Sequence, residues 1–203
     1  MFAIATRADR TDGPTLDIHA SGLVSGTRVA TTVGWRPVET ILPGDGVLTF
    51  DEGMQTVIRA HRSVLWDDPL SCPPTLWPLR VPVGALGNQS QMLLLPEQPV
   101  LLESDTAEEI FGDPFTVMPA LALDGFRGIC REKPVTRVEV ISLCFKVDQV
   151  IFANIGAMFY CPRVLSGEAR ADFLEEARYT SLTIAQGETL ASIIEMDEAR
   201  AIA

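Results

Sequence analysis

The chain has 203 residues, of which 47% are hydrophobic, and this suits one domain, or one domain with a modest appendage, around a real core. Its formal charge is −11 at pH 7 and no lysine or arginine cluster is visible, which disfavours binding to nucleic acid or to an anionic membrane surface. No apolar run approaches the roughly 18–20 residues of a membrane span, and the N-terminus lacks the apolar core of a signal peptide, so we expect a soluble protein, either cytoplasmic or exported without a standard signal.

The first 20 residues predict a leader, because they mix Thr, Asp and Arg and are interrupted at Gly13-Pro14. From about residue 27 the pattern is that of short β-strands. Two β-prone runs flank Gly34 and indicate a hairpin, and a strand over 47–50 is followed by a tight turn over 51–53. A longer strand is expected over 55–65. The next segment, 66–78, holds four prolines and predicts a surface loop.

The middle of the chain continues the β pattern. We expect a strand that leads into a short helical turn over 83–86, two short strands separated by a turn over 96–99, and a strand followed by a helical turn after Pro119. The stretches "TRVEVISLCFKV" and "QVIFANI" are β-branched and apolar. They predict central, paired strands that meet at a hinge around Asp148.

The pattern changes after about residue 165. Ser166 as an N-cap and apolar residues at helical spacing predict a helix within 166–178. Leu190, Ile193 and Ile194 lie on a second helical stripe, which Gly187 separates from the preceding segment. We therefore predict a leader over 1–20, a β domain over 21–165 and a helical appendage over 166–203, whose apolar stripe packs on the β domain or, alternatively, binds a partner.

The four cysteines give no sign of a metal site. They form no Cys-x-x-Cys pair, and no histidine lies near any of them in the sequence. Zinc sites need closely spaced thiol and imidazole ligands, so we predict no metal, and the sequence offers no cofactor-binding motif. Cys144 lies in an apolar run and is expected to be a buried thiol.

Four blocks follow one another in the order known from hedgehog/intein (Hint) domains, and the chain resembles the bacterial subgroup called Hint_2. The first block is "GLVSGTRVATTVGWRPVETILPGDGVLTFDEGMQTV", and the others are "LRVPVGALGN", "MLLLPEQPVLLES" and "VISLCFKVDQVIFANIGAMFYCP". Together they cover about residues 20–165. The resemblance implies a mainly β fold, a compact horseshoe of short hairpins, to which the one or two C-terminal helices are added.

The resemblance also implies a reaction. In active relatives the first residue is Cys or Ser, whose side chain attacks the preceding carbonyl in an N→S or N→O acyl shift, while a histidine of the middle block helps to protonate the departing nitrogen. The Gly26-Thr27 pair places Gly22 at the nucleophile position, and glycine has no side chain to attack with. The middle-block histidine corresponds to Gln98, and the closing-block histidine to Asp148, or to Gln149 if the register slips.

These replacements lead us to expect no catalytic residue at all. We interpret the chain as a degenerate domain that serves as a structural or peptide- and protein-interaction module, binding a peptide or protein segment, or its own leader, by strand addition. The alternative is residual autoproteolysis near Ser21/Gly22. In that reading Ser21, Cys144 or Cys161 would act as the nucleophile, although Ser21 lies one residue early and should face the opposite side of an extended chain.

Three further polar residues bear on the same chemistry. His19 and His61 are the only histidines; both are expected at the surface, although His19 lies close enough to Gly22 to be a stray proton donor. Asn154 invites comparison with the asparagine that cyclises in protein splicing. Because Ile155 follows it in place of a nucleophile, we expect Asn154 to be structural.

Overall fold

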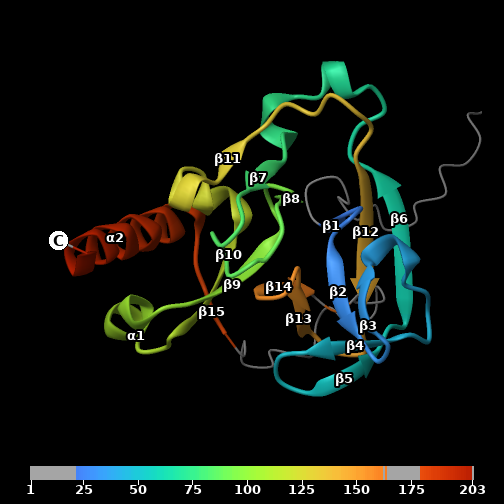
Figure 1. The fold of residues 1–203 in the computed structure, drawn as a ribbon, viewed down its shortest axis with the longest axis horizontal. Helices are drawn as coiled ribbons and strands as arrows, with labels where there is room; N and C mark the ends of the chain where they lie inside the picture. The colour runs from blue at the N-terminus through green and yellow to red at the C-terminus, as the bar shows by residue number, and fades with distance from the viewer. Residues whose placement is uncertain (1–21, 162, 164–178, 203) are drawn as a thin grey trace, which may run out of the picture.

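A computed structural model describes residues 22–161, 163 and 179–202 (Figure 1). Within them the chain forms short strands in two sheets, with two α-helices, which confirms the predicted mainly β fold with a C-terminal helix. Sheet A has the strand order β11 (Cys130–Arg131), β7 (Leu79–Val81), β8 (Met92–Leu94), β1 (Leu23–Val24), β12 (Glu139–Cys144) and β6 (Arg59–Val64).

Sheet B is the larger of the two, and β3 pairs with β2 beside the main order. Its strands are, in order, β15 (Thr180–Ser181), β10 (Phe115–Pro119), β9 (Pro99–Glu103), β14 (Ala157–Cys161), β13 (Gln149–Ala153), β2 (Arg28–Thr31), β4 (Gly46–Thr49) and β5 (Gly53–Thr56), with β3 (Gly34–Pro37) at the side. Short 3-10 helices connect the strands: η1 (Val38–Thr40), η2 (Pro69–Ser71), η3 (Pro74–Leu76), η4 (Ala120–Leu123) and η5 (Phe126–Gly128). The expected hairpins at Gly34 and over 51–53 are the β2–β3 and β4–β5 pairs.

Two strand predictions were wrong. The segment 55–65 is not one strand, because the chain passes from sheet B to sheet A at Val57-Ile58. The Val57 amide donates to the Asp45 carbonyl (2.9 Å), whereas the next amide, of Ile58, donates to the Cys144 carbonyl (2.8 Å). β12 and β13 are each flanked by strands on both sides, as their apolar sequences indicated, but in different sheets and not as a pair. Apolar content predicts burial, and it does not say which strand is the neighbour.

The main core is shared by both sheets and the C-terminal helix. It contains Leu23 and Ile141 of sheet A, Ile151 and Phe159 of sheet B, and Leu190 from α2 (Ile184–Ile202). The stripe predicted on α2 therefore packs on the β domain. A short helix that the sequence analysis did not predict, α1 (Asp105–Phe111), connects β9 to β10 and lies beside α2 in Figure 1. The helix expected within 166–178 lies outside the described residues, and no described helix is long and apolar enough to cross a membrane.

Gly187 does not interrupt the C-terminal helix, as was predicted, but lies inside it. A Cβ atom at this position would lie 2.7 Å from the Ala122 Cβ and 3.0 Å from the Met118 Sδ. The missing side chain thus lets α2 approach β10 and η4 closely, which explains a glycine in a helix interior. Farther along α2, the Arg127 backbone amide donates to Glu195 (2.7 Å) and its guanidinium pairs with Glu198.

The turn between β13 and β14 holds an isoleucine in an unfavourable conformation. Ile155 has a φ of 60°, which is rare for a β-branched residue and costs about 1–2 kcal/mol, and its side chain is 40% exposed. Asparagine tolerates this conformation better. We therefore expect Ile155→Asn to raise the free energy of unfolding by about 1 kcal/mol, measured by urea denaturation. Ile110→Asn, at an exposed helical position, should give no such gain; an equal gain at both positions would contradict the strain argument.

Candidate functional site

The predicted nucleophile position lies directly before β1, between β12 and β8. Leu23 pairs with Ile141, so Gly22 lies opposite Ser142. Gly22 has a φ of +131°, and a Cβ atom built there would lie 2.6 Å from the Val140 Cγ1 and 3.2 Å from the Ser142 Oγ. Cβ atoms do not approach other atoms as closely as 2.6 Å. The space that a nucleophilic side chain would need is therefore filled by Val140.

Gln98, at the position of the middle-block histidine, does reach Gly22. Its side chain is buried, with 2% exposed, and its Oε1 accepts a hydrogen bond from the Gly22 amide at 3.0 Å. Its Nε2 donates to the Pro99 carbonyl at 3.1 Å and to the Tyr160 carbonyl at 3.3 Å. Because Gly22 precedes a strand of sheet A and Tyr160 lies in sheet B, Gln98 ties the two sheets together at this point.

The direction of these hydrogen bonds decides what Gln98 can do chemically. The atom that faces the Gly22 amide is an acceptor, and the two N–H groups on Nε2 are directed at carbonyls. A carboxamide does not titrate near neutral pH, in contrast to an imidazole. Gln98 therefore holds the nitrogen of the peptide bond before Gly22, but it has no proton to give to it.

Asp148 lies apart from this pair. Its carboxylate accepts hydrogen bonds from the Tyr160 hydroxyl at 2.7 Å and from the Arg163 amide at 2.6 Å. Burial and the contact with Asp148 raise the pKa of Tyr160. Within the described residues no hydrogen bond joins Asp148 to Gly22 or Gln98, so only one of the two predicted histidine positions meets the start of the domain. The alternative position, Gln149, is buried and donates to the Glu52 carboxylate at 3.0 Å.

The two thiols of the alternative mechanism are both buried. Burial raises the pKa of Cys144 and raises that of Cys161 to about 12. The thiolate is the reactive form of cysteine, and burial disfavours it at both positions. All four cysteines are free thiols, and no three His, Cys, Asp or Glu side chains of the described segments are grouped to hold a metal ion.

The remaining candidates occupy different places. Ser21 and His19 lie outside the described residues. His61 is exposed on β6, where it pairs with Ser142. Asn154 is buried and joins two strands of sheet B, since its side chain accepts from the Arg28 amide at 2.7 Å and its own amide donates to the Arg28 carbonyl at 2.8 Å.

Sequence reasoning missed Val140 and Ser142, the residues that line the space at Gly22. They lie more than 110 positions away in the sequence, and only the pairing of β1 with β12 brings them there. No local pattern marks either residue, because Val140 looks like any apolar strand residue and Ser142 like a polar interruption of the strand.

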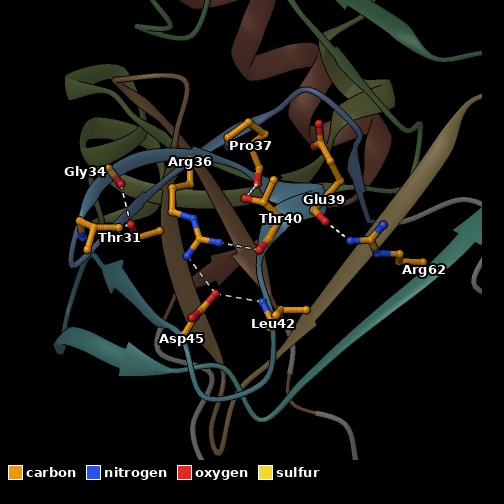
Figure 2. A network of polar contacts seen from close by, with 10 residues as sticks. Thr31, Gly34, Arg36, Pro37, Glu39, Thr40, Leu42, Asp45 and Arg62 are labelled. Carbon is orange, nitrogen blue, oxygen red and sulfur yellow. Dashed lines mark hydrogen bonds and ion pairs between the residues drawn. The ribbon is translucent and has the colours of Figure 1, made fainter.

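The motif residues of the first block hold the turn that follows β1. The Glu39 carboxylate accepts from the Gly26 amide at 2.9 Å, and the Val38 amide donates to the Thr27 carbonyl at 2.8 Å. On the other side, the Glu39 carbonyl accepts from the Arg62 guanidinium of β6 (Figure 2). These contacts fix the Gly26-Thr27 turn, and with it the position of Gly22 four residues earlier.

A second part of the same block locks the following loop. The Arg36 guanidinium contacts the Asp45 carboxylate at 3.0 Å and the Thr40 carbonyl at 2.6 Å, and Asp45 also accepts from the Leu42 amide at 3.0 Å (Figure 2). Charge-assisted contacts of this kind rigidify a loop more than neutral ones do. The retained motif residues thus stabilise the framework and take no part in contacts to Gly22.

A comparison with known protein families identifies the family to which this fold belongs. The sequence profile of the Hint domain, Hint_2, matches residues 21–158, which is more than half of the chain. The chain belongs to the Hint domain family. Among solved structures, this Hint domain is similar to a bacterial intein-like domain from Clostridium thermocellum, with 14% identity over 69% of this chain and 98% of that chain, and a TM-score of 0.44.

The gp41-1 intein is a further similar structure, with 15% identity over 68% of this chain and 97% of that chain, and a TM-score of 0.42. The chain matches no curated protein sequence. In this Hint domain Gly22 and the Gly26-Thr27 turn lie at the start of the matched segment, and the Gly22 amide is hydrogen-bonded to the buried Gln98.

Proposed function

We propose that this Hint domain does not cleave its own chain and serves instead as a structural or peptide- and protein-interaction module. The observation that carries the proposal is the 3.0 Å hydrogen bond from the Gly22 amide to the Gln98 Oε1. Attack on the carbonyl before Gly22 needs a nucleophile, and departure of the Gly22 nitrogen needs a proton. Gly22 offers no side chain, and Gln98 offers this nitrogen only a lone pair.

The second part of the proposal concerns what the rigid frame is used for. Both sheets end in strands that have a described partner on one side only, such as β6 in sheet A and β5 in sheet B. An exposed sheet edge carries unpaired N–H and C=O groups and accepts an extended segment by strand addition. We therefore assign the domain a role in holding a peptide or protein segment, with the leader over 1–20 as one candidate ligand.

The proposal that the domain does not cleave its own chain is tested by the mass of the intact chain. We expect a single species of full mass after several days at neutral pH, with and without added thiol or hydroxylamine, because neither an ester nor a thioester forms at Gly22. The same chain held in denaturant gives the background rate of peptide hydrolysis. Fragments that end at Ser21 and begin at Gly22, formed only by the folded chain, would overturn the proposal and support residual autoproteolysis.

A further inference from the structure

Strand β6 forms one edge of sheet A. In the described part of the chain it pairs with β12 alone, and Figure 1 shows it on the outer side of that strand. The Leu65 amide donates to the Val138 carbonyl at 2.9 Å, which marks this pair as hydrogen-bonded. Since bonding alternates along an antiparallel pair, the backbone groups of residues 59, 61 and 63 face β12. Those of residues 60, 62 and 64 face away from it, toward the open edge.

The side chains along this edge are basic. Arg59 and His61 are exposed, and within the described residues neither side chain makes a hydrogen bond or an ion pair. Arg62 is also exposed, although it pairs with Glu139 at 3.6 Å. The whole chain carries a formal charge of −11 with histidine counted as neutral, and the Arg59 guanidinium gives this edge a local positive charge on an acidic protein. Such a patch attracts segments of the opposite sign.

The charge along β6 also distinguishes between the segments that could pair with this edge. Two copies joined edge to edge would bring the Arg59 and Arg62 side chains of both together, and like charges across a strand pair are destabilising. In the leader, two arginines nearly balance three aspartates, so it matches the edge poorly. An acidic segment of another protein fits both the open backbone groups and the charge.

We propose that the outer edge of β6 is a docking strand for an acidic, extended segment of a partner protein. The inference rests on the proposed interaction role and names the site and the ligand chemistry. The segment's backbone pairs with the outward N–H and C=O groups of Ala60, Arg62 and Val64. Side chains of an added strand alternate between faces, so carboxylates at every second position lie beside Arg59 and His61, which share one face.

Two labelled, end-blocked ten-residue peptides, one alternating Thr with Glu and one alternating Thr with Lys, test this with the full chain. We expect fluorescence anisotropy to show binding of the Glu peptide at least about tenfold tighter than that of the Lys peptide, with affinity falling as salt screens the charges. Arg59→Glu should remove most of this preference. Arg200→Glu makes the same charge change on α2 and should leave the binding unchanged.

A backbone variant separates strand addition from simple charge attraction. Proline is tolerated on a sheet edge where its nitrogen faces solvent, so Ala60→Pro should keep the melting temperature close to that of the parent while it weakens binding of the Glu peptide about tenfold. Hydrogen exchange should show protection by the peptide at β6. If Ala60→Pro does not fold, the hydrogen-exchange protection of β6 by the peptide decides the question.

The possible results distinguish the site from the role. Binding of the Glu peptide that Arg59→Glu and Ala60→Pro leave unchanged, or protection at another strand, would overturn the β6 site and keep the interaction role. Failure of both peptides and of an uncharged Thr-Ser peptide to bind would overturn the interaction role as well. The intact mass of the chain tests the non-catalytic role independently of either result.

Discussion

Gly22→Cys should give a less stable domain and no cleavage, although it places the family's nucleophile at the family's position. The variant is expected to lose about 2–6 kcal/mol of unfolding free energy, of which the φ of +131° accounts for about 1–3 kcal/mol and overpacking for a similar amount. The overpacking arises because the new Cβ would lie 2.6 Å from the Val140 Cγ1. Urea denaturation measures the loss, and the intact mass in the presence of thiol reports cleavage.

Two alanine variants separate the causes. Gly22→Ala carries the same Cβ without the thiol, so it should lose nearly as much stability as Gly22→Cys. Gly26 has a φ of +91°, and a Cβ atom built there would meet nothing within 4 Å. Gly26→Ala should therefore show the conformational cost alone, about 1–2 kcal/mol. A Gly22→Cys chain that is as stable as Gly26→Ala and splits in thiol would contradict both the steric argument and the proposed inertness.

The contact with Val140 can also be tested directly. Val140→Ala removes the Cγ1 atom that the new side chain would meet, so in this background Gly22→Ala should cost at least about 1 kcal/mol less than in the parent. Val140 is fully buried, and its truncation alone is destabilising. The coupling between the two substitutions is therefore the quantity to compare, since two independent costs would simply add.

The sequence predicted the hairpins and the framework because their causes are local. Gly34 and Gly53 adopt turn conformations within a few residues of the strands that they connect, and a turn of this kind can be recognised in the sequence. The family pattern assigned Gln98 to the histidine position, but the sequence did not predict that Gln98 contacts Gly22. Its hydrogen bond spans 76 positions in the sequence and has no local signature.

The wrong predictions have one common physical origin. A pattern of apolar residues indicates which residues are buried, but not which elements they pack against. The segment 55–65 contains no glycine or proline and was predicted as one strand, although the chain changes sheets at Val57-Ile58. At Gly187, a residue that usually ends or weakens a helix is required by close packing on Met118 and Ala122. The same limit applies to the site, where Val140 closes the space at Gly22 by a pairing that only the tertiary structure specifies.

Gln98→Leu should destabilise the domain by about 2–3 kcal/mol, because a buried side chain of similar size then leaves the Gly22 amide without its acceptor and the Tyr160 carbonyl without this donor. Gln98→Glu is the matched variant, since it keeps the acceptor and removes the donors. At neutral pH its carboxylate would face the Pro99 and Tyr160 carbonyls, so we expect a loss at least as large. Thermal or urea unfolding measures both.

The pH dependence of Gln98→Glu identifies which half of the amide matters. Burial beside two carbonyls disfavours the charged form and raises the pKa of the introduced carboxyl above the value of about 4.3 expected in the unfolded chain. The folded state then binds more protons than the unfolded state, so the free energy of unfolding falls as pH rises through this range and recovers as pH is lowered. In Gln98→Leu no such recovery relative to the parent should occur. If the free energies of unfolding of the two variants depend on pH in the same way, the donor contacts to Pro99 and Tyr160 contribute little. The hydrogen bond to Gly22 would then be the contact that requires a polar residue at position 98.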